Sequence, residues 1–115
     1  MLEQKLKKKQ EFVNVFNSGK YLTSGSFIIR YVKRENDSFL GKARFGIVAS
    51  KKVGNAVKRN LAKRRIRCLV RLKDFRENDR DYVVIAKKNI LENKYRNLKL
   101  ELAKALKKIE LLENE

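Results

Sequence analysis

The segment from Ser50 to Lys73 constrains this chain more than any other, because it is strongly basic and contains no acid. Acidic residues are absent from the whole interval between Asp37 and Asp74, and Lys and Arg fill a third of it. Such one-sided charge repels itself in a folded chain unless a polyanion neutralises it. The segment therefore predicts a surface that binds a polyanion, with a solvated charged face as the alternative.

The same segment has the pattern of an amphipathic helix. Gly54 and Asn55 indicate a turn and an N-cap, and nothing from Ala56 onward breaks a helix. At about 100° per residue, one face is a polar stripe and the opposite half is apolar, except for Lys58 and Arg65, which we expect to extend into solvent. The stripe consists of Arg59, Asn60, Lys63, Arg64, Arg67 and Arg71, and the apolar half of Val57, Leu61, Ala62, Ile66, Cys68, Leu69 and Leu72.

Two further cations, Lys51 and Lys52, lie just before Gly54. The free backbone N–H groups of a helix N-terminus add positive potential at this point. We therefore expect these two lysines to extend a phosphate-binding surface formed by the stripe, while the apolar half packs on a core.

The overall composition limits the kind of partner and the compartment. A chain of 115 residues predicts one domain, residues 1–115, and its net charge of +17 leaves nucleic acid, an anionic membrane or an acidic protein as partners. No apolar run approaches 18 residues, and we expect no secretory signal in the charged N-terminus. The single cysteine, Cys68, is interpreted as a small core residue of a cytoplasmic protein.

Several kinds of catalysis are excluded by the residues that the chain lacks. It has no histidine, one cysteine and no glycine-rich nucleotide-binding pattern. The four acids of the segment Asp74–Asp81 lack the regular spacing of a calcium loop, so a solvated turn is the preferred interpretation. We expect no catalytic residue and no metal site on the protein itself.

The remaining pattern predicts an α+β fold with a mixed sheet of about four strands in the order α-β-β-β-α-β-α. Tyr21 and Leu22 form a small edge strand, and the strands at 26–33 and 42–50 are close enough for an antiparallel hairpin. Residues 81–87 are mainly apolar and β-branched, which is typical of a central strand buried on both faces. Helices are predicted at 8–18, where Gly19 ends the helix, and at 94–112, where mixed charge indicates a scaffold.

Two aromatic residues and one arginine are candidates for a second binding surface. Phe12 and Phe16 share one face of the first helix and form either core or a stacking platform for bases. In the strand at 26–33, Ile28, Arg30 and Val32 share a face, and the arginine indicates that this face is only partly buried.

These segments resemble the protein subunit of bacterial ribonuclease P over nearly the whole chain. The resemblance lies in LKKKQEFVNVFNSG, FGIVASKKVGNAVKRN and DYVVIAKK. It implies an RNA-binding subunit of an endoribonuclease that removes the 5′ leader of precursor tRNA, with cleavage performed by a catalytic RNA. Magnesium ions would be held mainly by that RNA and the substrate. The resemblance also implies a left-handed β-α-β crossover, against the general preference for right-handed ones.

The resemblance assigns roles to individual residues. RNA binding falls on Arg59, Asn60, Lys63, Arg64 and Arg67, to which the charge pattern adds Lys51, Lys52 and Arg71; a cleft for the leader falls on Phe12, Phe16, Arg30 and Lys87. This sequence departs from the pattern of the family at three positions. Leu61 replaces a usual arginine, Arg30 occupies a position expected to be aromatic, and no proline follows Lys87. We expect Arg30 to contact the leader by guanidinium stacking and phosphate attraction.

The first hypothesis is thus the protein component of ribonuclease P, with the catalytic RNA and precursor tRNA as partners and with neither a membrane nor an obligate protein partner. The alternative from another class is a ribosomal or other structural RNA-binding protein without a substrate groove. A nuclease in its own right is disfavoured because histidine is missing.

Overall fold

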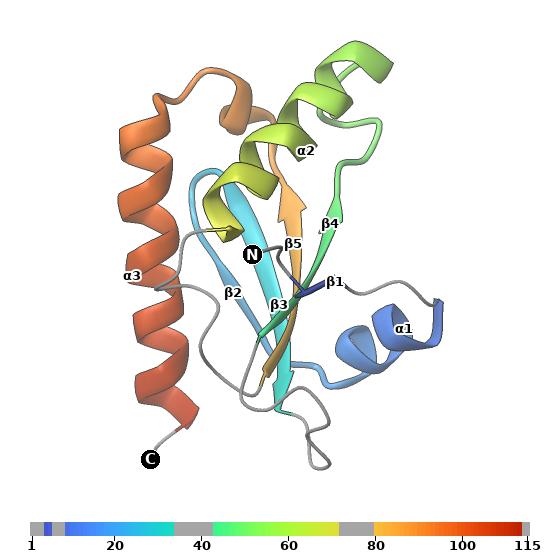
Figure 1. The fold of residues 1–115 in the computed structure, drawn as a ribbon, viewed down its shortest axis with the longest axis vertical. Helices are drawn as coiled ribbons and strands as arrows, with labels where there is room; N and C mark the ends of the chain where they lie inside the picture. Colours follow the sequence, from blue (N-terminus) through green and yellow to red (C-terminus); the bar gives the residue numbers. More distant parts are fainter. Residues whose placement is uncertain (1–3, 6–8, 34–42, 72–79, 114–115) are drawn as a thin grey trace.

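A computed structural model describes residues 4–5, 9–33, 43–71 and 80–113 (Figure 1). A five-stranded mixed sheet with the strand order β1-β4-β5-β3-β2 forms its centre, and helices lie on both sides. The elements are β1 (Gln4–Lys5), α1 (Lys9–Asn17), β2 (Tyr21–Thr23), β3 (Phe27–Lys33), β4 (Arg44–Val48), α2 (Ala56–Val70), β5 (Arg80–Ala86), the 3-10 helix η2 (Lys88–Leu91) and α3 (Tyr95–Glu113). The predicted α+β class is confirmed, with β1 as an additional edge strand too short to leave a periodic signal.

The sheet pairing confirms one prediction about the strands and corrects another. β5 is central, antiparallel to β3 and parallel to β4, and six of its seven residues are buried. β2 is the predicted edge strand, antiparallel to β3. The predicted hairpin between β3 and β4 is wrong, because β5 lies between them. A strand that is apolar on both faces needs a neighbour on each side, and β5 obtains these by separating β3 from β4.

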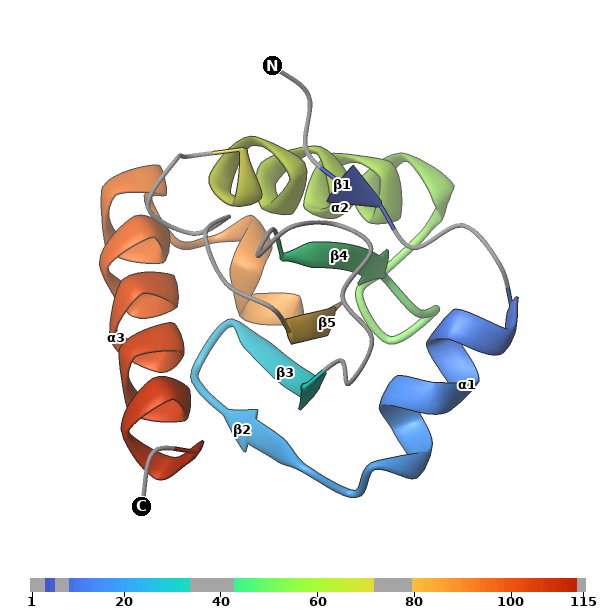
Figure 2. The ribbon, with the colours of Figure 1, turned by 60° about the horizontal axis from the view of Figure 1, so that its bottom comes forward.

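The connection from β4 through α2 to β5 is left-handed, as the family resemblance implied. Both strands point upward in Figure 1, α2 lies in front of them, and the chain moves from β4 to the strand on its left. Figure 2 agrees, because α2 moves to the top when the bottom of the molecule comes forward. The general preference for right-handed crossovers therefore fails here.

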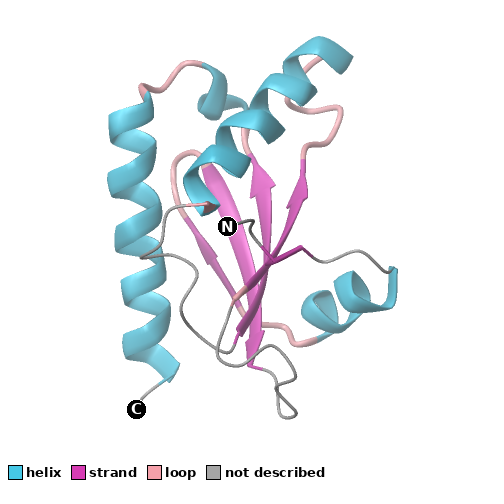
Figure 3. Ribbon diagram, viewed as in Figure 1, coloured by secondary structure: helices cyan, strands magenta, loops and turns pink. Residues whose placement is uncertain are grey.

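One side of the sheet, here named the closed face, is covered by α2, η2 and α3 (Figure 3). Strand alternation places its residues on this side, and every one of them is at most 5% exposed. They pack against Ala62, Ile66 and Leu69 of α2 and Leu98, Leu102 and Ile109 of α3. The closed face consists of Phe27, Ile29, Tyr31, Phe45, Tyr82, Val84 and Ala86.

The other side, here named the open face, is covered only in part. α1 places Val15 against Val83 of β5, and both are fully buried. Around that small cluster lie side chains that are half-buried and partly accessible: Phe12, Ile28, Arg30, Val32, Val48 and Ile85. Figure 2 shows α1 apart from α2 and α3, on the far side of the sheet. The prediction that the face of Arg30 is only partly buried is confirmed.

Some predicted features lie outside the described ranges, namely Leu72 and most of the acidic segment Asp74–Asp81. Within the described ranges, none of the helices combines the length and the apolar character that a membrane span requires.

Candidate nucleic-acid interface

The basic helix α2 begins with a well-formed cap. The Asn55 side chain accepts a hydrogen bond from the Lys58 backbone N–H at 3.0 Å, which satisfies one free donor of the first turn. Gly54 precedes it at φ +146°, and a Cβ there would lie 2.6 Å from Cδ of Lys58. Lys51 and Lys52 are exposed in the turn before the cap. The turn thus holds both lysines at the entrance to the helix, as the sequence predicted.

The polar stripe of α2 runs along the border between the buried side and the exposed side of the helix. Asn60, Arg64 and Arg71 are exposed. Arg59, Lys63 and Arg67 are half-buried at the edge of the core, and Nε of Arg59 is buried without a hydrogen-bond partner among the described residues. The stripe therefore presents cations from the edge of the core outward, and α2 itself supplies no acid to neutralise them.

The apolar half of α2 was predicted too wide. Val57 is 76% exposed and Leu61 is 38% exposed, and Cys68 is exposed rather than in the core. Ala62, Ile66, Leu69 and Val70 are the buried residues of the helix. A helix that crosses a small sheet buries only the side chains that touch the sheet. The apolar half of a helix, as defined by its sequence pattern, can therefore be wider than the part that is buried.

Arg65 also differs from its prediction, because it does not extend into solvent. Its NH1 group donates at 2.8 Å to the carbonyl oxygens of both Ile90 and Asn93. A charged donor shared by two carbonyls near η2 fixes α2 against the segment before α3. Lys58 is exposed, as expected.

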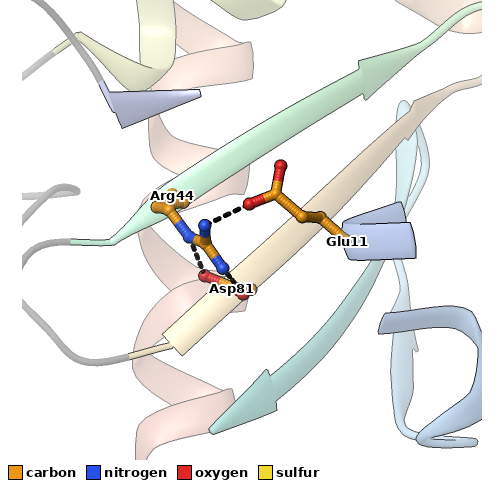
Figure 4. Close-up of polar contacts among 3 residues, drawn as sticks. All are labelled: Glu11, Arg44 and Asp81. Atoms are coloured by element: carbon orange, nitrogen blue, oxygen red, sulfur yellow. Dashed lines mark hydrogen bonds and ion pairs between the residues drawn. The ribbon is translucent and has the colours of Figure 1, made fainter. Parts of the chain in front are cut away.

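Helix α1 is fixed to the open face at both ends. Near its start, Glu11 pairs with Arg44 of β4, which also donates to both carboxylate oxygens of Asp81, at 2.8 and 2.5 Å (Figure 4). The hydrogen bond with Asp81 raises the pKa of Arg44. After its end, Ser18 Oγ donates to the Tyr31 carbonyl at 2.9 Å. Asp81 is thus part of a buried ion pair, which corrects its assignment to a solvated turn.

The two phenylalanines of α1 have different surroundings. Phe12 is half-buried and packs against the cluster of Val15 and Val83. Phe16 is 38% exposed, and the guanidinium carbon of Arg30 lies 4.9 Å from its ring centroid. The same carbon lies 5.6 Å from the ring centroid of Tyr21, which is 58% exposed. The structure therefore brings Phe16 and Arg30 together and adds a tyrosine to them.

Lys87, the fourth residue predicted for the leader cleft, does not lie near α1. It follows the last residue of β5, and its Nζ donates to the Ser24 carbonyl at 2.6 Å, in the turn between β2 and β3. α1 is anchored at the opposite end of β5, where Asp81 lies. The structure thus separates Lys87 from α1 along the length of the strand.

Three side chains that shape this surface were not singled out from the sequence. Tyr21 was expected only as part of an edge strand, Arg44 received no role, and Arg65 was expected to face solvent. Tyr21 pairs directly with Arg30 across β2 and β3, so recognising the Ser24–Ser26 turn would have placed the two side by side. The partners of Arg44 and Arg65 are 25 to 37 residues away and leave no local signal.

Metal ligands do not gather anywhere in the described parts of the chain: no group of three or more acidic or cysteine side chains is positioned to hold an ion there. Two of the described acids, Glu11 and Asp81, are engaged by Arg44, and Glu101 accepts from the Ser26 backbone N–H at 2.9 Å. The chemistry that this surface offers is therefore cationic and aromatic: it can bind phosphate groups and stack on bases.

Comparisons of the sequence with a family model and with known proteins point to the same family. The family model described as Ribonuclease P matches residues 2–110. The ribonuclease P protein component of Streptococcus pyogenes serotype M5 (strain Manfredo) is 36% identical over 109 residues, which is 95% of this chain and 88% of that protein.

Solved structures agree with the sequence comparison. The ribonuclease P protein of Thermotoga maritima superposes with a TM-score of 0.76 at 29% identity, covering 92% of this chain and 97% of that one. A Staphylococcus aureus ribonuclease P protein, a mutant described as defective in mRNA degradation activity, superposes with a TM-score of 0.77 at 26% identity, covering 92% and 87%.

Proposed function

The chain belongs to the ribonuclease P protein family, and from that premise we propose that it binds the catalytic RNA through α2 and the 5′ leader of precursor tRNA on the open face. Membership of the family gives it a role in an endoribonuclease of tRNA processing, with RNA as a partner in the assembled enzyme. The assignment of the two surfaces to the two RNAs is the part that we propose.

The observation that carries the proposal is the cationic stripe of α2, a helix that contains no acid. Six polar side chains, five of them cationic, follow one flank of a helix that contains no acid. Binding to a phosphate backbone releases counterions for each phosphate neutralised, so such a stripe has high affinity for RNA and little preference for sequence. Lys51 and Lys52 extend the stripe beyond the N-cap of α2.

The open face supports the second half of the proposal. A single-stranded leader offers unstacked bases and phosphates, and the face offers the exposed ring of Phe16 and the guanidinium of Arg30 side by side. The closed face offers nothing comparable, because its side chains are buried under α2 and α3. A leader on the open face would be held while the rest of the tRNA lies on the catalytic RNA.

In this proposal the protein performs no bond cleavage. Magnesium ions held mainly by the RNA and the substrate would supply the activated water and stabilise the leaving oxygen. The cations of α2 reduce the repulsion between two polyanions, and the open face orients the leader relative to the cleavage site. A cytoplasmic location is part of the same proposal.

Turnover of precursor tRNA tests the proposal. The purified protein, the catalytic RNA and the reconstituted complex are compared at a low magnesium concentration, with 5′-end mapping of the product. We expect the complex to cleave, the RNA alone to be far slower and the protein alone to be inactive. Cleavage by the protein alone would identify a nuclease, and a protein that binds RNA without accelerating cleavage would identify a structural RNA-binding protein.

A further inference from the structure

Tyr21 is the most exposed aromatic side chain of the open face and has no assigned role. It lies in the edge strand β2, 58% exposed, directly opposite Arg30 in the pairing with β3. Paired residues of antiparallel strands project to the same side of a sheet, so Tyr21 projects to the open face. Its ring is therefore accessible on the surface proposed for the leader.

Arg30 links this ring to helix α1. Its guanidinium carbon lies over both rings, 5.6 Å from the Tyr21 centroid and 4.9 Å from the Phe16 centroid, within the range of cation–π attraction. Its NH1 group also donates to the Phe16 carbonyl oxygen at 3.4 Å. The free protein thus already holds the guanidinium in place, which reduces the entropy lost when a ligand binds.

We propose that Tyr21, Arg30 and Phe16 form one nucleotide-binding unit, in which an unpaired leader base stacks on the exposed ring of Tyr21 and Arg30 pairs with a phosphate next to that base. This inference rests on the proposed function, because it assumes that the leader lies on the open face. It also revises the expected role of Arg30: its guanidinium already lies against two rings, so its remaining N–H groups serve phosphate.

The unit combines a ring and a cation on two neighbouring strands. The ring is provided by the directly opposite residue of the neighbouring strand. The stacking surface therefore lies on the edge strand of the sheet, with a fixed positive charge beside it. A base that stacks on Tyr21 contacts a side chain that contributes little to the core, since most of the ring is in solvent.

The test uses the holoenzyme reconstituted with its catalytic RNA and measures affinity for precursor tRNA and for mature tRNA. Tyr21→Leu removes the ring but keeps an apolar side chain, Tyr21→Phe keeps the ring, and Tyr95→Leu is the matched control, because Tyr95 is 46% exposed at the start of α3. We expect Tyr21→Leu to weaken precursor binding by about 5- to 100-fold, the range of base–aromatic stacking, and to leave mature tRNA unaffected. Tyr21→Phe and Tyr95→Leu should match the wild-type protein.

Single abasic leader nucleotides sharpen this test. One leader position should exist where removing the base weakens the wild-type complex but has no further effect in Tyr21→Leu, because base and ring form one contact. Arg30→Gln should reduce the salt dependence of precursor binding while leaving that abasic effect in place.

The outcomes separate this inference from the proposed function. If the wild-type holoenzyme does not distinguish precursor from mature tRNA, the proposed leader contact is wrong. If it does distinguish them and Tyr21→Leu preserves the difference, only the role of Tyr21 is overturned. The same conclusion follows if the effect of an abasic nucleotide and the effect of Tyr21→Leu are additive at every leader position. A loss in Tyr21→Leu that is equal for both substrates also overturns it.

Discussion

The two faces of the sheet are built from the same strands and serve opposite purposes. On β3, Ile29 and Tyr31 point to the closed face and are 1% and 5% exposed, whereas Ile28 and Arg30, next to them in the chain, remain half-buried on the open face. The closed face is covered by two long helices, and the open face by the nine-residue helix α1. The difference shows where the fold is stabilised and where it keeps surface for a ligand.

The contrast extends to the way in which charge is used. Beside α1, Arg44 is enclosed by Glu11 and Asp81, so its charge serves the fold. On the open face, Arg30 is placed over two partly exposed rings with no acid in its described contacts. A cation that is surrounded by acids holds elements together, whereas one that is surrounded by rings remains available to an anion.

The largest effect is expected when the anchor of α1 is removed. Arg44→Met should lower the free energy of unfolding by about 3–5 kcal/mol, because it removes the guanidinium that is bound to the buried carboxylate of Asp81. Urea unfolding monitored by circular dichroism measures the loss. Adding Asp81→Asn should recover part of it, since the second change removes the buried charge that has lost the guanidinium.

A loss below about 1 kcal/mol for Arg44→Met would contradict this, because that is the value of an exposed ion pair. It would mean that the ion pairs of Arg44 contribute little to holding α1 on the open face.

A neighbouring pair of residues compares the two faces directly. Ile29→Ala on the closed face should cost about 2–5 kcal/mol of unfolding free energy, because it leaves a cavity in a core that cannot collapse. Ile28→Ala on the open face should cost roughly 1 kcal/mol, because its side chain is already partly in water. Denaturant midpoints of the two variants give the comparison, and equal losses would show that the open face is as well packed as the closed one.

A smaller effect is expected from the stripe of α2. Arg67→Ala should reduce the slope of log K against log salt by about one unit and weaken different RNAs to a similar extent, because it removes one phosphate contact. Affinity for the catalytic RNA, measured at several salt concentrations, gives the slope. Leu111→Ala on α3, also a change at an exposed position, serves as the control and should leave the slope unchanged. An affinity that does not depend on salt would contradict the assignment of α2 to phosphate.

Much of the fold could be predicted from local patterns. The unbroken apolar run of β5 indicated a central strand, the cap at Asn55 indicated the start of α2, and the alternation around Arg30 indicated a half-open face. Each of these follows from residues that are neighbours in the sequence, so no tertiary information is needed.

The errors arose where distant segments decide the outcome. The hairpin between β3 and β4 was wrong because β5, more than 30 residues later, takes the place between them. Cys68 was placed in the core because helical periodicity defines a face but not its rotation, which Arg65 helps to set through η2. The stack of Phe16, Arg30 and Tyr21 required both the β2–β3 register and the position of α1.

Site-directed crosslinking tests most directly whether the open face contacts the leader. In a Cys68→Ser background, which removes the single cysteine, a photoreactive reagent is attached to Asn17→Cys next to Phe16, or to Lys107→Cys on the exposed side of α3. With the holoenzyme and precursor tRNA, we predict crosslinks to leader nucleotides from position 17 and none from position 107. Leader crosslinks from position 107 alone, or equally from both positions, would contradict the division of the molecule into a closed, structural face and an open, ligand-binding one.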